Sequence, residues 1–132
     1  MPVAVLAAVL ALAGCGSSAS DQVRAVVGQL AQAAADRAYG TICTEILAPS
    51  LVAHLVSNGI PCPQALRLAL SGVRNPVLSV GKVIIRGSRA WAITLTSARG
   101  QKAALVAIEL SRTRQGWRIT SLASPLSAVQ GR

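Results

Sequence analysis

Aromatic side chains are nearly absent from this chain. Its 132 residues include two Trp, one Tyr and no Phe, so a hydrophobic core has to be built mainly from Val, Leu, Ile and Ala. Proteins that bind single-stranded nucleic acid without sequence preference stack successive bases on exposed aromatic rings. Three aromatic residues offer too few such platforms. Nucleic acid is therefore not an expected partner.

Carboxylates and imidazoles are also scarce, because the chain has four Asp and Glu residues and one His. General acid–base catalysis and zinc binding depend largely on these side chains. We interpret His54 as a surface residue, Asp36 as a capping or ion-paired residue, and Glu45 as a favourable charge at a helix start. No nucleophile elbow or phosphate-binding glycine loop occurs in the sequence. We expect no catalytic residue, no metal site and no cofactor, with a proton-transfer enzyme as the minor alternative.

Positive charge is concentrated in the second half of the chain. Of the 13 Lys and Arg residues, only Arg24 and Arg37 precede residue 67, and Glu109 is the one carboxylate after it. A basic surface attracts anionic lipid head groups and acidic polymers. A solvated face of an arginine-rich protein is the alternative. The candidates for contact with an anionic surface are Arg86, Arg89, Arg112, Arg114 and Arg118.

An apolar run that starts at Val3 ends in Leu12-Ala13-Gly14-Cys15 and is followed by a polar stretch, residues 16–20. This junction resembles the lipobox of bacterial lipoproteins. The resemblance implies that residues 1–14 are a signal peptide, that the Cys15 thiol receives a diacylglyceryl group, and that residues 15–20 form a flexible tether. We expect the protein to be anchored by lipid, including palmitate, at the extracytoplasmic face of the cell membrane.

The length of this run argues against a transmembrane anchor. About a dozen residues span about 18 Å as a helix, whereas the bilayer core is about 30 Å thick. A buried helix is the remaining alternative. No Lys or Arg precedes the run, although secretory signals begin with positive charge. We therefore expect the true start of translation to lie upstream of Met1.

Two cysteines remain once Cys15 is assigned to lipid. An even pair in an exported protein predicts a disulfide, here between Cys43 and Cys62. It would close a loop of about 20 residues and stabilise the fold by roughly 3 kcal/mol. A metal site is disfavoured because these thiols and His54 supply three ligands at most.

Helical periodicity dominates the first half of residues 21–132. Ser18 and Asp21 have the spacing of a capping box, and apolar residues at helical spacing predict a helix to about Tyr39 that Gly40 ends. Shorter helices are predicted over about 41–47, 51–57 and 63–72. From Pro76 the period changes to two, which predicts strands over about 77–86, 89–97, 103–112 and 117–122.

Short connections between the strands predict hairpins and an antiparallel sheet. The last hairpin should pair Arg112 with Trp117 and Leu110 with Ile119. This register makes one face polar, with a weak ion pair between Glu109 and Arg118. The opposite, dry face would carry Ala104, Val106, Ile108, Leu110, Trp117 and Ile119. We expect one α+β domain, with the N-terminal helices on the concave face of a curved three- or four-stranded antiparallel sheet.

Several segments of the chain match those of one known protein family. They are Ala35-Asp36-Arg37-Ala38-Tyr39, the segment 42–47 followed by Pro49, Cys62, Ser88-Arg89-Ala90-Trp91-Ala92-Ile93, and Gly116-Trp117-Arg118-Ile119. Through these segments, about residues 21–122 resemble small actinobacterial lipoproteins with a nuclear transport factor 2-like, cystatin-like domain. The resemblance implies a cone-shaped fold that encloses an apolar pocket, and some relatives in that superfamily are isomerases, dehydratases or cyclases.

Two non-catalytic functions are compatible with these features. In the preferred one, the domain is an interaction module that contacts an envelope protein, an anionic lipid or a polymer, and its own side chains fill the pocket. In the alternative, it is a carrier or sensor that binds a small apolar ligand. Its pocket would then be open and lined by Trp91, Val106, Ile108 and Trp117.

Overall fold

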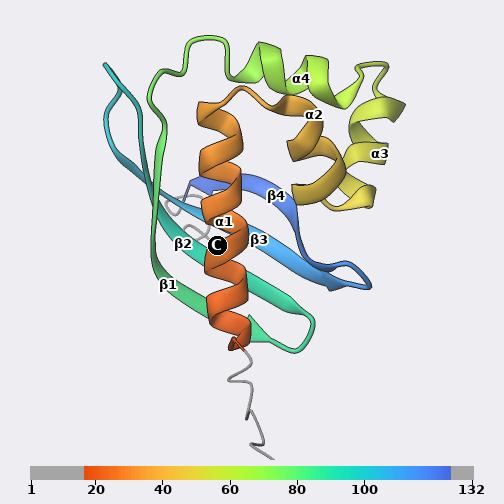
Figure 1. Cartoon of the computed structure of the whole chain (residues 1–132), viewed down its shortest axis with the longest axis vertical. Helices are drawn as coiled ribbons and strands as arrows, with labels where there is room; N and C mark the ends of the chain where they lie inside the picture. The colour runs from red at the N-terminus through yellow and green to blue at the C-terminus, as the bar shows by residue number, and fades with distance from the viewer. Residues whose placement is uncertain (1–16, 126–132) are drawn as a thin grey trace, which may run out of the picture.

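A long helix, α1 (Ala19–Ala35), crosses one face of a four-stranded antiparallel sheet (Figure 1). The computed structural model describes the backbone of residues 17–125 and the burial of side chains in residues 17–121. The expected α+β class is confirmed. The predicted signal peptide and Cys15 lie outside the described residues. The other elements are α2 (Tyr39–Thr41), the π-helical segment η1 (Ile42–Ile46), α3 (Pro49–Ser57), α4 (Cys62–Ala69), β1 (Val77–Arg86), β2 (Arg89–Ser97), β3 (Ala104–Thr113) and β4 (Gly116–Pro125).

Helix α1 begins where the sequence predicts but ends earlier. The Ser18 hydroxyl accepts a hydrogen bond from the Asp21 backbone N–H at 3.1 Å, which caps the first turn. The helix ends at Ala35, so the prediction that it reaches Tyr39 and is ended by Gly40 is wrong. Arg37 adopts a left-handed conformation (φ 55°), and hydrogen bonds from Arg37 to Ala34 and from Ala38 to Ala33 close a Schellman motif.

The short helical segments are joined to one another and to the sheet. The disulfide between Cys43 and Cys62 connects η1 to the first residue of α4, with a Cα–Cα distance of 6.1 Å. This confirms the predicted pairing. At the end of η1, the Ala48 N–H donates to the Ile119 carbonyl at 2.8 Å, and Leu47 forms a parallel bridge with Ile119. The helices are thereby held against β4.

The sheet has the order β1-β2-β3-β4. The predicted pairs Arg112–Trp117 and Leu110–Ile119 are confirmed. Bulges interrupt β1 near Gly81 and β4 near Thr120, and bulges increase the local twist of a sheet. Arg24 of α1 donates to the carbonyls of Val80 and Gly81, both at 2.9 Å. The helix is therefore tied to the irregular part of β1.

The two faces of the sheet differ less than the sequence predicts. The face toward α1 is dry: the side chains of Ala90, Ala92, Thr94, Ile108, Leu110, Trp117 and Ile119 are buried. Ala104, predicted on this face, is exposed because it is the first residue of β3. The outer face, predicted to be wet, also carries apolar side chains, including Leu95 and Leu105, which are 44% and 53% exposed.

Candidate functional site

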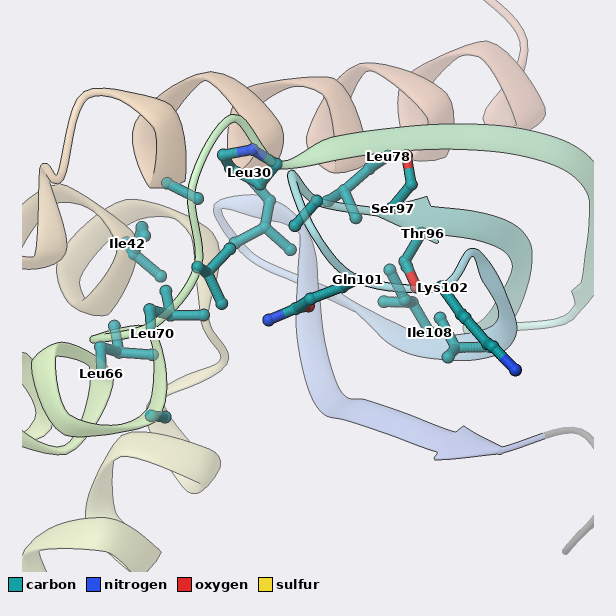
Figure 2. A pocket seen from close by; sticks show the side chains of 16 residues that line it. Leu30, Ile42, Leu66, Leu70, Leu78, Thr96, Ser97, Gln101, Lys102 and Ile108 are labelled. Atoms are coloured by element: carbon teal, nitrogen blue, oxygen red, sulfur yellow. The ribbon is translucent and has the colours of Figure 1, made fainter.

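A cavity of about 370 Å³ lies between α1, α4 and the inner face of the sheet (Figure 2). It is at the end of the sheet where the β2–β3 hairpin meets the loop that follows α4. A backbone hydrogen bond of 2.8 Å from the Arg99 N–H to the Arg74 carbonyl joins this hairpin to this loop. Two of the three exposed lining residues, Gln101 and Lys102, belong to this hairpin. The mouth therefore lies on this side, beside two segments that are fixed to each other.

The interior of the cavity is apolar because three patterns in the sequence converge there. The buried stripe of α1 supplies Leu30, α4 supplies Leu66, and alternate residues of the strands supply Leu78, Val106 and Ile108. Alanines also line the cavity where α1 and α4 face it, and none of the three aromatic residues does so. The scarcity of large rings in the sequence thus leaves space unfilled between helix and sheet.

Polar groups line the cavity on the side of the β2–β3 hairpin. They belong to Thr96, Ser97, Gln101 and Lys102. The Thr96 hydroxyl donates to the Ala104 carbonyl at 3.2 Å. In Figure 2 the Gln101 side chain runs from the hairpin toward the helices, and the Lys102 side chain runs the opposite way. Among the described residues, Lys102 is the one with a charged side chain that lines this cavity.

The carboxylates and the imidazole of the described residues lie away from the cavity. Among the described residues that line the cavity there is no Asp, Glu, His or Tyr, and these side chains are the usual general acids and bases. Asp36 accepts a hydrogen bond from Gln32 at 3.0 Å at the end of α1, and His54 is exposed on α3. Neither side chain lines the cavity.

Two of the four residues proposed to line a pocket lie at this cavity. Val106 and Ile108 line the cavity, whereas Trp91 and Trp117 do not. Trp91 lies opposite Ile84 and Glu109 on the outer face, because its neighbours Ala90 and Ala92 take the buried positions of β2. Trp117 is on the inner face but at the other end of the sheet, in the β3–β4 hairpin.

The sequence missed the lining residues that the helices and β1 supply. Leu30 belongs to the apolar stripe of α1, and Leu78 alternates with exposed residues in β1. These patterns mark both residues as inward-facing. They carry no sign that the opposing residues leave an opening, because that depends on how α4 packs beside α1.

The five proposed surface arginines gather at the opposite end of the sheet. Two hairpins meet there, and the Arg112 N–H donates to the Ser88 carbonyl at 2.7 Å. The guanidinium carbon of Arg112 lies 4.9 Å from the centre of the Trp117 ring, and that of Arg89 lies 5.2 Å from the centre of the Trp91 ring. Arg86 and Arg114 are exposed on the same two hairpins.

The predicted ion pair between Glu109 and Arg118 is wrong. Glu109 pairs with Arg89 across β2 and β3, while Arg118 donates to the Thr44 carbonyl at 2.9 Å. The bulge near Thr120 places Ser121 opposite Glu109, so the hairpin does not keep the regular register that the prediction assumed.

Comparison of the chain with protein-family models, curated proteins and solved structures finds no match. Within residues 17–125, every helix is too short or too polar to span a bilayer. The same residues contain no group of three or more His, Cys, Asp and Glu side chains placed to hold a metal ion.

Proposed function

We propose that this chain is an extracytoplasmic lipoprotein with a nuclear transport factor 2-like domain that binds a small apolar ligand as a carrier or sensor. The cavity between α1, α4 and the sheet carries this proposal. Its volume of about 370 Å³ falls within the range of about 300–1,000 Å³ typical of small-molecule sites. An apolar interior with a few polar groups at one side is also typical of such sites.

The cavity changes the order of the two sequence-based hypotheses. An interaction module with a pocket filled by its own side chains was preferred, and a carrier with an open pocket was the alternative. The open space favours the carrier. Because no carboxylate or imidazole lines the described cavity, binding is also a better proposal than an isomerase-type or dehydratase-type reaction.

The proposed anchor lies close to the folded domain. Helix α1 is capped by Ser18, which follows Cys15 by three positions with two residues between them. Fully extended, three residues reach about 10 Å. A ligand exchanged with the membrane would therefore have a short distance to travel to the domain.

The test is native mass spectrometry of the protein purified from its own envelope. We expect the protein to carry a small ligand, and Ala69→Phe to lose it, because Ala69 lines the cavity from an exposed position on α4. Ala25→Phe is the matched control, since Ala25 is exposed on α1 and lines no part of the cavity. A ligand-free protein that also fails to bind apolar probes would contradict the proposal.

A second candidate function is contact with an anionic lipid, an acidic polymer or an envelope protein. The gathering of Arg86, Arg89, Arg112, Arg114 and Arg118 at one end of the sheet supports it. The double change Arg86→Gln and Arg114→Gln should reduce co-sedimentation with phosphatidylglycerol vesicles and leave that with phosphatidylcholine vesicles unchanged. An equal effect on both vesicles would exclude recognition of the charge.

A further inference from the structure

We propose that the ligand of the cavity is an amphiphile with an anionic head group, which Arg74, Arg99 and Lys102 receive at the mouth. This inference rests on the proposed ligand-binding function and adds the chemical class of the ligand. The apolar tail lies in the interior between α1 and the sheet. The head group stays at the mouth, in contact with water.

The sequence positions of the three cations place them at one rim. Lys102 lines the cavity itself. Arg74 lies in the loop between the lining residues Val73 and Pro76. Arg74 is not itself a lining residue, but it belongs to one of the two segments that border the cavity on this side.

The third cation comes from the other bordering segment. Arg99 lies in the β2–β3 hairpin between the lining residues Ala98 and Gln101. Its backbone N–H donates to the Arg74 carbonyl at 2.8 Å, so the backbones of the two arginines are adjacent. Both segments that border the cavity on this side therefore carry a cationic residue, and their backbones are joined at Arg74 and Arg99.

No carboxylate in the described residues neutralises this rim. Glu109 pairs with Arg89 toward the opposite end of the sheet, and Asp36 accepts a hydrogen bond from Gln32. Asp21 lies in the first turn of α1, and Glu45 lies in η1. All three cationic residues of the rim are exposed. Their charge is available to a ligand.

The charge of the rim and the apolar interior select for different parts of one molecule. Arg and Lys donate charge-assisted hydrogen bonds to carboxylate and phosphate oxygens. A neutral amphiphile would fill the interior equally well but gain nothing from the cations. Since exposed charges are screened by salt, the preference for an anionic head group should shrink as ionic strength rises.

The test compares dodecanoate, dodecyl phosphate and dodecan-1-ol, each measured by displacement of the neutral fluorophore Nile red. The full chain carries Cys15→Ser so that no acyl chain of its own competes. We expect both anions to bind more tightly than the alcohol at low salt. The tighter of the two anions identifies phosphate or carboxylate as the favoured head group.

Substitutions then locate the preference. Lys102→Gln should weaken dodecanoate binding about fivefold, which corresponds to the upper end of the interaction energies of exposed ion pairs. The affinity for dodecan-1-ol should not change. Changing Arg74 and Arg99 to Gln as well should weaken the binding of dodecanoate further. Arg114→Gln removes the same charge at the other end of the sheet and should change neither ligand. Unchanged melting temperatures would show that the variants are folded.

Two results would overturn the inference, and each disproves a different part of it. Equal binding of dodecanoate and dodecan-1-ol, unaffected by Lys102→Gln, would disprove the anionic class while the apolar cavity remained a binding site. Failure of all three compounds to displace the fluorophore, or of the fluorophore to bind, would disprove ligand binding itself.

Discussion

Arg37 occupies a backbone conformation that side chains normally avoid. Its φ of 55° lies in the left-handed region, which costs a residue with a Cβ roughly 1–2 kcal/mol. Glycine is the usual residue at this position of a helix end. Because residue 37 is Arg and not Gly, nothing in the sequence signals that α1 ends here. The prediction instead placed the end of the helix at Gly40, three residues later.

Arg37→Gly should stabilise the protein by about 0.5–1 kcal/mol, because glycine avoids the steric cost but loses more conformational freedom on folding. Thermal unfolding should show a melting temperature a few degrees higher. Arg37→Ala keeps the Cβ and should show no such gain. If the two variants were equally stable, the left-handed conformation would not be the cause.

Trp117 shows a different limit of sequence-based prediction at a single residue. It was expected to line the pocket, and it is instead 4% exposed in the core beneath Arg112. Its indole Nε1 has no hydrogen-bond partner among the described residues. Alternation identifies the face on which Trp117 lies, but it does not fix its distance along the sheet from the cavity.

Between elements, contacts made by the helices hold the layers in place. Arg24 donates two hydrogen bonds from α1 to carbonyls in the bulge of β1. The sequence predicted the strand boundaries closely because the hydrophobic period changes at Pro76. It did not predict the bulges, although the alternation is interrupted at both, by Gly81-Lys82 in β1 and by Thr120-Ser121 in β4. The predicted position of Glu109 was wrong because the bulge in β4 was missed.

Arg24→Met should lower the free energy of unfolding by about 1–2 kcal/mol, because it keeps most of the aliphatic stem and removes both hydrogen bonds. Urea denaturation measures the change. Arg67→Met is the control, since Arg67 is exposed on α4 and makes no side-chain hydrogen bond within the described residues. Equal effects of the two substitutions would mean that the contact with β1 contributes nothing specific.

The disulfide should make a larger contribution than any single hydrogen bond. The double change Cys43→Ala and Cys62→Ala should reduce stability by about 3 kcal/mol, since the bridge closes a loop of about 20 residues in the unfolded chain. Urea denaturation measures this loss. Mass analysis after alkylation without a reductant should find neither thiol modified in the parent domain. Two alkylated residues would contradict the bridge.

Across the whole molecule, the two ends of the sheet carry different chemistry. The β2–β3 hairpin end borders the apolar cavity, and the end formed by the other two hairpins carries the five arginines. The composition predicted that positive charge would dominate the second half of the chain. The alternation of side chains along β3 predicted that Val106 and Ile108 face inward. The family resemblance implied an apolar pocket, but whether it is open or filled was not predictable, because the space arises from small residues on helices that meet only in the folded protein.

The proposed anchoring is a property of the whole chain, and we expect it to depend on Cys15. Cys15→Ser should abolish incorporation of labelled palmitate and move the protein out of the membrane fraction. The double change Cys43→Ala and Cys62→Ala leaves Cys15 in place and should retain the label. Continued labelling of the Cys15→Ser variant would contradict lipid attachment at this residue.

The bulge in β1 and the bridge from Leu47 also bear on self-association. An open sheet has two edge strands whose unpaired backbone groups recruit strands from other chains. On β1, the carbonyls of Val80 and Gly81 already accept hydrogen bonds from Arg24. On β4, Leu47 forms a backbone bridge with Ile119, and the Ala48 N–H donates to the Ile119 carbonyl. The contacts that fix the helices therefore also occupy part of the backbone of each edge strand. This should disfavour edge-to-edge pairing of a domain whose outer face carries exposed apolar side chains such as Leu95 and Leu105.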